Sequence, residues 1–355
     1  MNLFREDLLN KPEIKVAVPQ RQHMMCLNES SFDPMDALSH QIIQSFDRIK
    51  INSYTSSVTQ ELKQALADYV GYGIDKSQFL FGNGVDEMLY FIFTAVRADK
   101  NSYAASLAPS YFDYSTYSGS VGLNIRFMDF DTDFDFNVNA YLTSLNRPDC
   151  KLGILCNPNN PTGHFLSDAK IIHILQNTQK PIVIDETYYE FSGKTFADQI
   201  KTYPNIIITR SFSKSFSAAG LRFGYIISSP ENIYYLNKVI PLFNSSMITQ
   251  TIALTFLQNK AVFEDFNKII LANKKKLFDQ MCKYPQVVAL PSETNFITFS
   301  VGEKSAALNE YLLEKDISVR PVWAHPLLKN YLRVTVCHEQ MNNLFLGALD
   351  EFLQI

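Results

Sequence analysis

The stretch "NIIITRSFSKSFSAAGLRFGYIIS", residues 205–228, joins two apolar runs through a loop rich in serine, phenylalanine and alanine. Each apolar run has the length and composition of a buried strand. Lys214 lies in the loop between them, and Arg222 follows eight residues later. A lysine among small and apolar neighbours is either a solvated loop charge or a group that works inside a site, and this stretch alone leaves both interpretations open.

Similar apolar runs recur along the chain and alternate with segments typical of helices. Segment 57–71 begins with a Ser-x-x-Gln pattern and stops at Gly71, which predicts an amphipathic helix with a capping box. Short strands that alternate with helices predict an α/β fold with a mainly parallel sheet covered on both faces. The strand-like runs are "QFLF", "KLGILC", "PIVID", "NIIIT" and "RFGYIIS", and the helix-like segments include "VDEMLYFIFTAV" and "SDAKIIHILQNT".

The pattern changes beyond Pro241, where one long helical tract is followed by the strand-like runs "TNFITFS", "ISVRPV" and "YLRVTV". A chain of 355 residues also exceeds the size at which a single core usually stops growing. We therefore predict a large α/β domain over residues 33–243 and a smaller α+β domain. The N-terminal residues 1–32 and the C-terminal residues 244–355 form this smaller domain.

Composition narrows the classes of partner. The net charge of −4 disfavours nucleic acid and acidic membranes, because both bind proteins that neutralise phosphate, and it leaves small molecules as the expected ligands. The charged N-terminal segment does not resemble a signal peptide and no apolar run is long enough to span a bilayer, which predicts a cytoplasmic protein. Five cysteines without a CxxC pair and histidines without ligand spacing predict reduced thiols and no metal site.

The loops after the strands are the expected place for chemistry, because open α/β sheets bind ligands at the carboxyl ends of their strands. The turn "GNGVDE" at 82–87 precedes a helix and forms either an ordinary turn or an anion cradle. It lacks the third glycine of the dinucleotide fingerprint. The turn "NPNNPTG" at 157–163 is rigid, and its side-chain amides can donate to a ligand oxygen.

Asp185 ends the apolar run "PIVI", where a carboxylate is either a helix cap or a counter-charge. One ligand, pyridoxal phosphate, would use all of these features. Its phosphate needs an anion cradle and a cation, its ring nitrogen a carboxylate, its phenolic oxygen donors, and its aldehyde a lysine for a Schiff base. Lys214 suits the last task, because desolvation and a nearby cation lower the pKa of an amine.

The order of "GNGVDE", "APSYFDY", "NPNNPTG", "DETYYEF", "SFSKSFSAAGLRFG" and "YLRVTV" resembles that of fold-type I pyridoxal-phosphate-dependent aminotransferases. The closest resemblance is to the histidinol-phosphate aminotransferase group, and it extends from Leu27 into the C-terminal domain. It implies the fold of these transferases, with pyridoxal 5'-phosphate as cofactor. It also implies a role in amino-acid biosynthesis and a homodimer with composite active sites.

The resemblance assigns roles by motif position. Lys214 would form the Schiff base, Asp185 would face the ring nitrogen, Asn160 and Tyr188 would contact the phenolic oxygen, and Tyr111 would stack on the ring. Tyr188 and Asp185 join Lys214 as the implied catalytic residues. The residues implied around the phosphate are Ser211, Ser213, Arg222, the backbone of Val85 and Asp86, and Tyr54 reaching from the neighbouring subunit.

Arg333 in "YLRVTV" matches the family arginine that grips a carboxylate, a bidentate task suited to guanidinium. Arg320 resembles a second anion-binding arginine of the group, and Asn28 lies in the matching substrate loop. Two arginines suggest a substrate with two anionic groups. The group usually has a Pro-Tyr pair near the N-terminus and a "NENPxGP" segment, whereas this chain has "VAVPQRQ" and "LNESSFDP".

Three functions fit these residues. The first is an aminotransferase that cycles glutamate and 2-oxoglutarate against an amino acid or amine, such as histidinol phosphate or a related anionic substrate. The alternative is a decarboxylase that resembles the threonine-phosphate decarboxylases, and the cofactor residues do not separate the two. A binding or regulatory protein without turnover is the third, which the complete set of Lys214, Asp185 and Arg222 disfavours.

Overall fold

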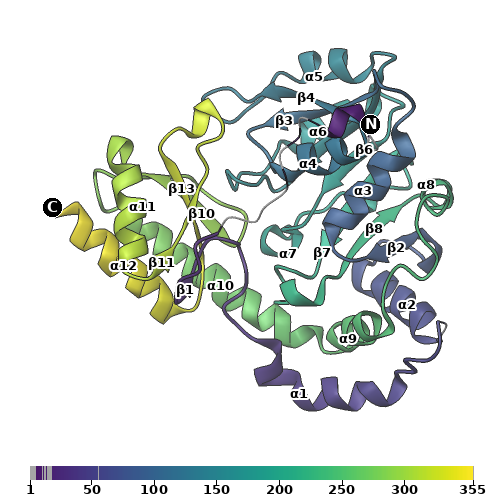
Figure 1. The fold of residues 1–355 in the computed structure, drawn as a ribbon, viewed down its shortest axis with the longest axis horizontal. Coiled ribbons are helices and arrows are strands. Elements are labelled where there is room, and N and C mark those ends of the chain that lie inside the picture. The colour runs from purple at the N-terminus through teal and green to yellow at the C-terminus, as the bar shows by residue number, and fades with distance from the viewer. Residues whose placement is uncertain (1–4, 10, 12, 14–17, 55, 355) are drawn as a thin grey trace.

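The computed structural model of the chain describes residues 5–9, 11, 13, 18–54 and 56–354, and its centre is a seven-stranded sheet. The strands are β2 (Phe79–Gly82), β3 (Tyr103–Ala108), β4 (Asn124–Asp129), β5 (Cys150–Cys156), β6 (Ile182–Asp185), β7 (Ile206–Ser211) and β8 (Gly224–Ser228). They lie in the order β2-β8-β7-β6-β5-β3-β4 (Figure 1). β8 runs antiparallel to both of its neighbours and the remaining pairs are parallel, so the predicted α/β fold with a mainly parallel sheet is confirmed.

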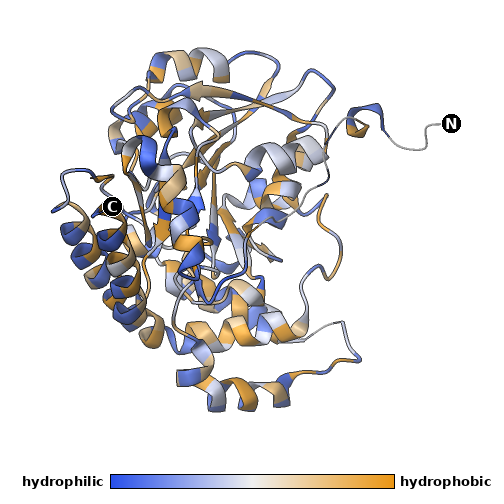
Figure 2. Cartoon of the chain, turned by 60° about the vertical axis from the view of Figure 1, so that its left-hand side comes forward, coloured by the Kyte–Doolittle hydropathy of each residue, from blue (hydrophilic) through white to orange (hydrophobic). Residues whose placement is uncertain are grey.

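Helices cover both faces of this sheet, and each face has its own apolar core. The helices on one face are α3 (Val85–Val96), α4 (Asp113–Ser120) and α8 (Pro230–Leu236). Those on the other face are α1 (Pro34–Ser45), α2 (Val58–Val70), α5 (Val138–Leu145), α6 (Asp168–Gln176) and α9 (Met247–Gln258). Figure 2 shows hydrophobic residues concentrated in the central strands, with helices on both sides of them. A short helix, α7 (Tyr189–Ser192), follows β6.

The predicted helix at 57–71 is present as α2, and it ends at Gly71, whose φ of 75° suits glycine. The predicted capping box at its start is wrong. Ser57 already has helical backbone angles and makes no side-chain capping bond. Its carbonyl instead accepts from the backbone N–H groups of Gln60 and Glu61, so the helix starts through its main chain.

A smaller α+β part, also as predicted, packs beside the large sheet at the left of Figure 1. Its elements are α10 (Lys260–Met281), β9 (Val288–Ala289), β10 (Phe296–Ser300), α11 (Ser305–Glu314), β11 (Ile317–Ser318), β12 (Arg320–Pro321), β13 (Tyr331–Thr335) and α12 (Glu339–Leu353). Four strands form an antiparallel sheet in the order β12-β13-β10-β9. Strand β1 (His23–Met24) pairs with β11, which joins this N-terminal segment to the smaller part.

The predicted domain limits at residues 33 and 244 stay a prediction. The expected single helical tract is two helices, α9 and α10, which meet at Asn259. Side chains of α9, with Phe263 at the start of α10, belong to the core on the large sheet. Ile270 and Leu277, later in α10, belong to the core of the smaller part. The first part of the tract thus packs on the large sheet and its later part on the smaller part.

Within the described residues, no helix is both long and apolar enough to cross a lipid bilayer.

Candidate active site

Three central strands end side by side at one edge of the large sheet. Cys156 on β5 and Thr209 on β7 are the register partners of Asp185 on β6. The loops that follow these strands carry the motifs identified in the sequence. A buried parallel sheet collects strand-end side chains in this way, so residues far apart in the chain form one site.

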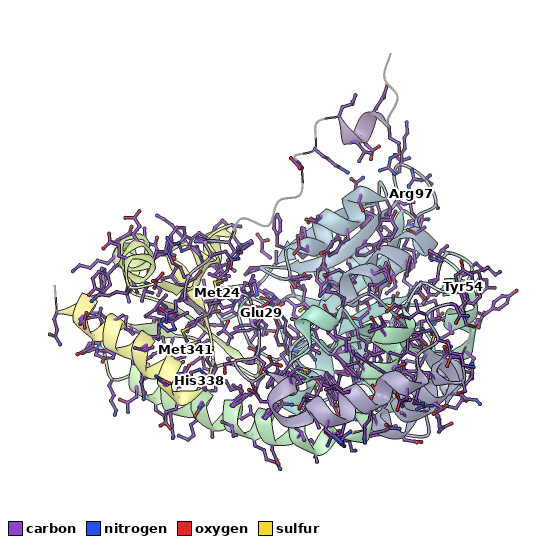
Figure 3. The ribbon with its side chains drawn as sticks, turned by 60° about the horizontal axis from the view of Figure 1, so that its bottom comes forward. Met24, Glu29, Tyr54, Arg97, His338 and Met341 are labelled. Carbon is purple, nitrogen blue, oxygen red and sulfur yellow. The ribbon has the colours of Figure 1, made fainter. Side chains whose placement is uncertain are left out.

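Lys214 lies in the loop after β7, and its Nζ donates to the carbonyl of Leu27 at 2.8 Å. Desolvation lowers the pKa of Lys214 to about 8, and the charges of Arg333 and Arg222 act in the same direction. Exposed Glu29 lies where the two parts of the molecule meet and opposes this shift (Figure 3). The amine is therefore partly neutral near neutral pH, as a nucleophile or base requires.

Asp185 is buried, at 3% exposure. Its Oδ2 accepts from the hydroxyl of Tyr114 at 2.7 Å, and its Oδ1 accepts from Thr187 Oγ1 at 2.7 Å and Thr187 N at 3.1 Å. Burial raises the pKa of Asp185, and these hydrogen bonds oppose the rise. All of these partners are neutral, so a cation beside the carboxylate would complete its surroundings.

The start of α3 and Arg222 form a second cluster. Arg222 adopts a left-handed conformation with φ 54°, and its guanidinium donates to Asp86 at 3.1 Å. A Cβ at Gly84 would come within 2.6 Å of this guanidinium, and one at Gly224 would come within 2.5 Å of the backbone N of Val85. Only glycine permits this close approach, which brings a cation to the positive end of a helix.

Two serines of the lysine loop are buried near this cluster. Ser211 accepts from the backbone N–H of Ser213 at 3.0 Å, which shapes the turn that leads to Lys214. A cavity of ≈ 580 Å³ is lined by Ser213 and Ser217 of the lysine loop and by Glu29.

Asn160 and Tyr188 each form a hydrogen bond with a residue from a distant part of the sequence. Arg333 donates to Asn160 Oδ1 at 2.6 Å and to the carbonyl of Cys26 at 2.9 Å. Asn28 donates to the hydroxyl of Tyr188 at 2.8 Å. Burial raises the pKa of Tyr188 to about 12, so its phenol stays neutral and can donate a proton at neutral pH. The smaller part thereby supplies residues to the sheet edge.

Tyr111 lies at the start of the α4 segment, and its hydroxyl donates to Asp86 at 3.2 Å. Its ring meets that of Tyr114 edge to face at 5.3 Å, with an interplanar angle of 86°. This contact fixes the plane of the Tyr111 ring, which suits a residue that stacks on a flat ligand.

Of the remaining predicted residues, Tyr54 lies apart from this group and Arg320 lies at its edge. Tyr54 is 78% exposed and stacks on Phe243 at 5.0 Å, at the outer edge of the molecule (Figure 3). Arg320 is exposed on β12, where it is the register partner of Arg333 on β13. The assigned roles of all these residues stay predictions.

Sequence reasoning missed several polar residues beneath the site. Tyr114 and Thr187 hold Asp185, as described above. Glu186 and Arg210 form a fully buried ion pair at 2.8 Å, each with 1% exposure. Arg210 stands out in the sequence as a charge inside an apolar strand, and that signal predicts a buried partner. Tyr114 has no such signal, because its helix is neither strongly apolar nor charged.

These residues fit pyridoxal phosphate on structural grounds. Among the described residues, the hydrogen-bond donors to the buried carboxylate of Asp185 are neutral, so it would match a protonated ring nitrogen. The glycine-permitted approach of Arg222 to α3 would match a phosphate, and Lys214 has the lowered pKa that reaction with an aldehyde needs. Each part of the cofactor thus finds a chemically suitable group.

The sequence pattern of the family described as "Aminotransferase class I and II" matches residues 21–349. A histidinol-phosphate aminotransferase of Thermoanaerobacter sp. (strain X514) is 33% identical over an alignment of 356 positions that covers 99% of each chain. The histidinol-phosphate aminotransferase of Caldanaerobacter subterraneus subsp. tengcongensis is 32% identical over 352 residues, again 99% of each chain. Both similarities include the large sheet and the smaller part.

Solved structures share the fold. The histidinol-phosphate aminotransferase of Sinorhizobium meliloti in complex with pyridoxal-5'-phosphate superposes with a TM-score of 0.84 at 22% identity, covering 94% of this chain and 92% of that one. The L-threonine-O-3-phosphate decarboxylase of Porphyromonas gingivalis gives a TM-score of 0.79 at 22% identity, covering 94% and 100%. At these identities the likeness concerns the fold alone.

Proposed function

The chain belongs to the class I and II aminotransferases and uses pyridoxal 5'-phosphate, and from this premise we propose that it exchanges an amino group between glutamate and an amine of the histidinol-phosphate type. The alternative of a decarboxylase has the weaker support, since the relatives that match over the whole chain are named as aminotransferases. We also propose that the protein works in the cytoplasm, where the buried free thiols of Cys26, Cys150, Cys156 and Cys337 stay reduced.

The proposal for the substrate depends on the surroundings of Arg333. Arg333 is 8% exposed, and its Nε has no hydrogen-bond partner among the described residues. It lies directly opposite Arg320 in the antiparallel pairing of β12 and β13. Two guanidinium groups on neighbouring strands suit a phosphate or carboxylate of the substrate, because that anion would supply the missing partner.

We assign the chemical roles to the residues around Asp185 and Lys214. When bound, the cofactor supplies an electron sink that weakens the bonds of the substrate carbon carrying the amine. Lys214 Nζ would hold the cofactor covalently in the resting enzyme and, once the substrate amine has displaced it there, the freed amine would carry the proton to and from that carbon. Asp185 would keep the ring nitrogen protonated, and Tyr188 and Asn160 would donate to the phenolic oxygen. Tyr111 would hold the ring plane by stacking.

The phosphate of the cofactor would be held by Arg222, the first N–H groups of α3 and the serines of the lysine loop. The positive end of a helix and a guanidinium both favour a dianion. Asp86 accepts from Arg222 and would orient it. These assignments predict that Arg222→Ala weakens cofactor binding more than it changes the rate of the bound enzyme.

The test of the proposed reaction uses the cofactor as its own indicator. Purified protein is mixed with histidinol phosphate, with glutamate or with L-threonine-O-3-phosphate, and the absorption spectrum is followed in a single turnover, together with released CO₂ for the two substrates that carry a carboxylate. Conversion of the aldehyde form to the amine form without CO₂ supports transamination. Release of CO₂ supports the decarboxylase, and absence of both with every amine would contradict the proposal.

We further propose a homodimer in which Tyr54 completes the partner's phosphate site. The Tyr54 patch consists of Ile51, Tyr54, Leu242 and Phe243, which are 87%, 78%, 87% and 58% exposed. Such grouped apolar side chains are typical of a surface that another protein covers. Figure 2 also shows hydrophobic residues along the outlying helix α1.

Mixed dimers test this assembly. A Lys214→Ala chain combined with a Tyr54→Ala chain should form one intact site per mixed dimer if Tyr54 acts across the interface. A matched control combines Lys214→Ala with Asp185→Asn, two defects that both act in their own chain, and should regain nothing. Equal behaviour of the two mixtures, or full activity of a monomer in sedimentation, would contradict the composite site.

A further inference from the structure

The carboxylate of Asp185 is held by one hydroxyl on each oxygen. Tyr114 donates to Oδ2 at 2.7 Å, and Thr187 Oγ1 donates to Oδ1 at 2.7 Å. The backbone N–H of Thr187 adds a bond to Oδ1 at 3.1 Å. A carboxylate fixed at both oxygens cannot rotate about its last torsion without losing a charge-assisted hydrogen bond.

Tyr114 is rigid and chemically neutral. It is fully buried at 0% exposure, and burial together with Asp185 raises its pKa well above the ordinary value. Its ring meets Tyr111 edge to face, and the buried thiol of Cys156 lies beside its hydroxyl. The phenol therefore remains a donor throughout the working pH range.

We propose that Tyr114 and Thr187 are positioning residues that orient Asp185 and set its proton affinity toward the ring nitrogen of the cofactor. This inference rests on the proposed role of Asp185 and goes beyond it by assigning the control of that carboxylate. Hydrogen bonds to an ionised carboxylate favour the charged form. The two hydroxyls thus keep the shared proton on the ring nitrogen, where it strengthens the electron sink.

The sign of the effect follows from this arrangement. Removing the Tyr114 hydroxyl leaves Asp185 Oδ2 with one donor fewer, so the carboxylate becomes more basic. The proton shared with the ring nitrogen then moves toward Asp185, and the ring becomes less cationic. Both the binding of the cofactor and the rate of the bound enzyme should fall, because both depend on the same charge pair.

A double-mutant cycle tests the inference with Tyr114→Phe, Asp185→Asn and the combined variant. The readouts are the dissociation constant of pyridoxal phosphate from the apo-protein and the single-turnover rate. Tyr114→Phe should weaken binding and slow turnover by about tenfold or more, the usual size for a hydrogen bond to a charged group. In the Asp185→Asn background, where the carboxylate is absent, the same change should have an effect below about twofold.

Tyr103→Phe is the matched control. Tyr103 is also buried, at 1% exposure, and its hydroxyl donates to the Ser144 carbonyl at 2.7 Å, away from the site. This variant should bind the cofactor as the unchanged protein does. If Tyr114→Phe does not fold, as judged by thermal melting of the apo-protein, Thr187→Val removes the hydroxyl that donates to the other carboxylate oxygen, Oδ1. Its effect should depend on the Asp185 carboxylate in the same way.

The possible results distinguish a failure of this inference from a failure of the proposed function. Equal effects of Tyr114→Phe with and without the Asp185 carboxylate would mean ordinary packing and would overturn the inference, as would no effect at all. A strong effect of Asp185→Asn in either case keeps the proposed function. If Asp185→Asn itself leaves binding and turnover unchanged, both the role of Asp185 and the inference fall.

Discussion

Asp185 and Glu186 are neighbours in the sequence and both are buried, but their surroundings differ. Glu186 is paired with the guanidinium of Arg210 at 2.8 Å, whereas Asp185 accepts from the neutral groups of Tyr114 and Thr187. Burial raises the pKa of both carboxyls, and for Glu186 the charge of Arg210 is the largest opposing influence. The Glu186 charge is thus balanced within the chain, and the Asp185 charge is left for a cationic ligand.

The end of one strand thus serves two purposes. Successive residues of an extended chain point to opposite sides, so Asp185 and Glu186 face different surroundings. Glu186 also accepts from Thr195 Oγ1 at 2.8 Å and from the backbone N–H of Phe196 at 2.6 Å, which ties the following loop to Arg210. Removing the Glu186 charge should therefore damage the fold, and removing the Asp185 charge should damage the chemistry.

The largest expected effect is on stability and comes from Glu186→Gln. This change removes the carboxylate that pairs directly with the buried Arg210 guanidinium, and breaking a buried pair costs about 3–5 kcal/mol. Urea unfolding of the apo-protein measures the loss. Molecules that remain folded should turn over at nearly the normal rate, and a loss below about 1 kcal/mol would contradict the structural role of the pair.

The double variant Glu186→Met with Arg210→Met is the control for this prediction. It removes both charges and keeps apolar volume, so no ion is left unpaired. Its free energy of unfolding should lie closer to that of the unchanged protein than that of Glu186→Gln does. A double variant as unstable as the single one would show that packing, and not charge, explains the loss.

Asp185→Asn should have the next largest effect. In contrast to Glu186→Gln, it should lower the rate and not the stability. Single-turnover transamination should slow on the order of a hundredfold, the usual size for loss of one electrostatic contact in the reaction. Stability of the apo-protein should be unchanged or higher, because a desolvated charge is replaced by a neutral amide. A normal single-turnover rate would remove Asp185 from the mechanism.

A smaller effect concerns the pH at which Lys214 becomes reactive. With a pKa of about 8, the rate at which the apo-protein captures pyridoxal phosphate should rise about tenfold per pH unit below pH 8 and level off above it. Arg333→Met should move the midpoint upward, because a neighbouring cation lowers the pKa of the amine. A midpoint at the ordinary lysine value would contradict the buried setting of Lys214.

The smallest effect is a pH dependence of stability in the apo-protein. A carboxyl whose pKa is raised by folding binds its proton more tightly in the native state, so stability falls as pH rises through and above the ordinary value of 3.8. Asp185→Asn lacks this loss of stability. The difference between its free energy of unfolding and that of the unchanged protein should therefore grow with pH in that range. A difference that is independent of pH would contradict the raised pKa of Asp185.

The sequence predicts those parts of the fold that have a local signal. The helix "VDEMLYFIFTAV" is α3 at Val85–Val96, residue for residue. β3 and β4 escaped notice because "YAASLA" consists largely of small residues and "NIRFMD" is a half-exposed edge strand with polar side chains. The direction of β8 depends on how distant strands pair, which no local pattern contains.

The same limit holds for the site. Motifs at strand ends identify Lys214 and Asp185, because charged residues after apolar runs need a reason to be there. Tyr114 lies 71 residues from Asp185 in the sequence, and only the folded sheet brings its hydroxyl to the carboxylate. Residues that support a site through long-range contacts therefore remain invisible in a single sequence.

Borohydride reduction of the cofactor-loaded enzyme, followed by peptide mass mapping, identifies the lysine that binds the cofactor. Lys274 is the internal control, since burial lowers its pKa to about 8 as well, but its amine donates to the carbonyls of Ser292 and Thr294 at 2.7 and 2.9 Å, away from Asp185. The reduced cofactor should be found on Lys214 alone. Prior conversion of the cofactor to its amine form by an amine substrate should prevent the labelling. Label on Lys274 or on any other residue, or no bound cofactor, would contradict this prediction.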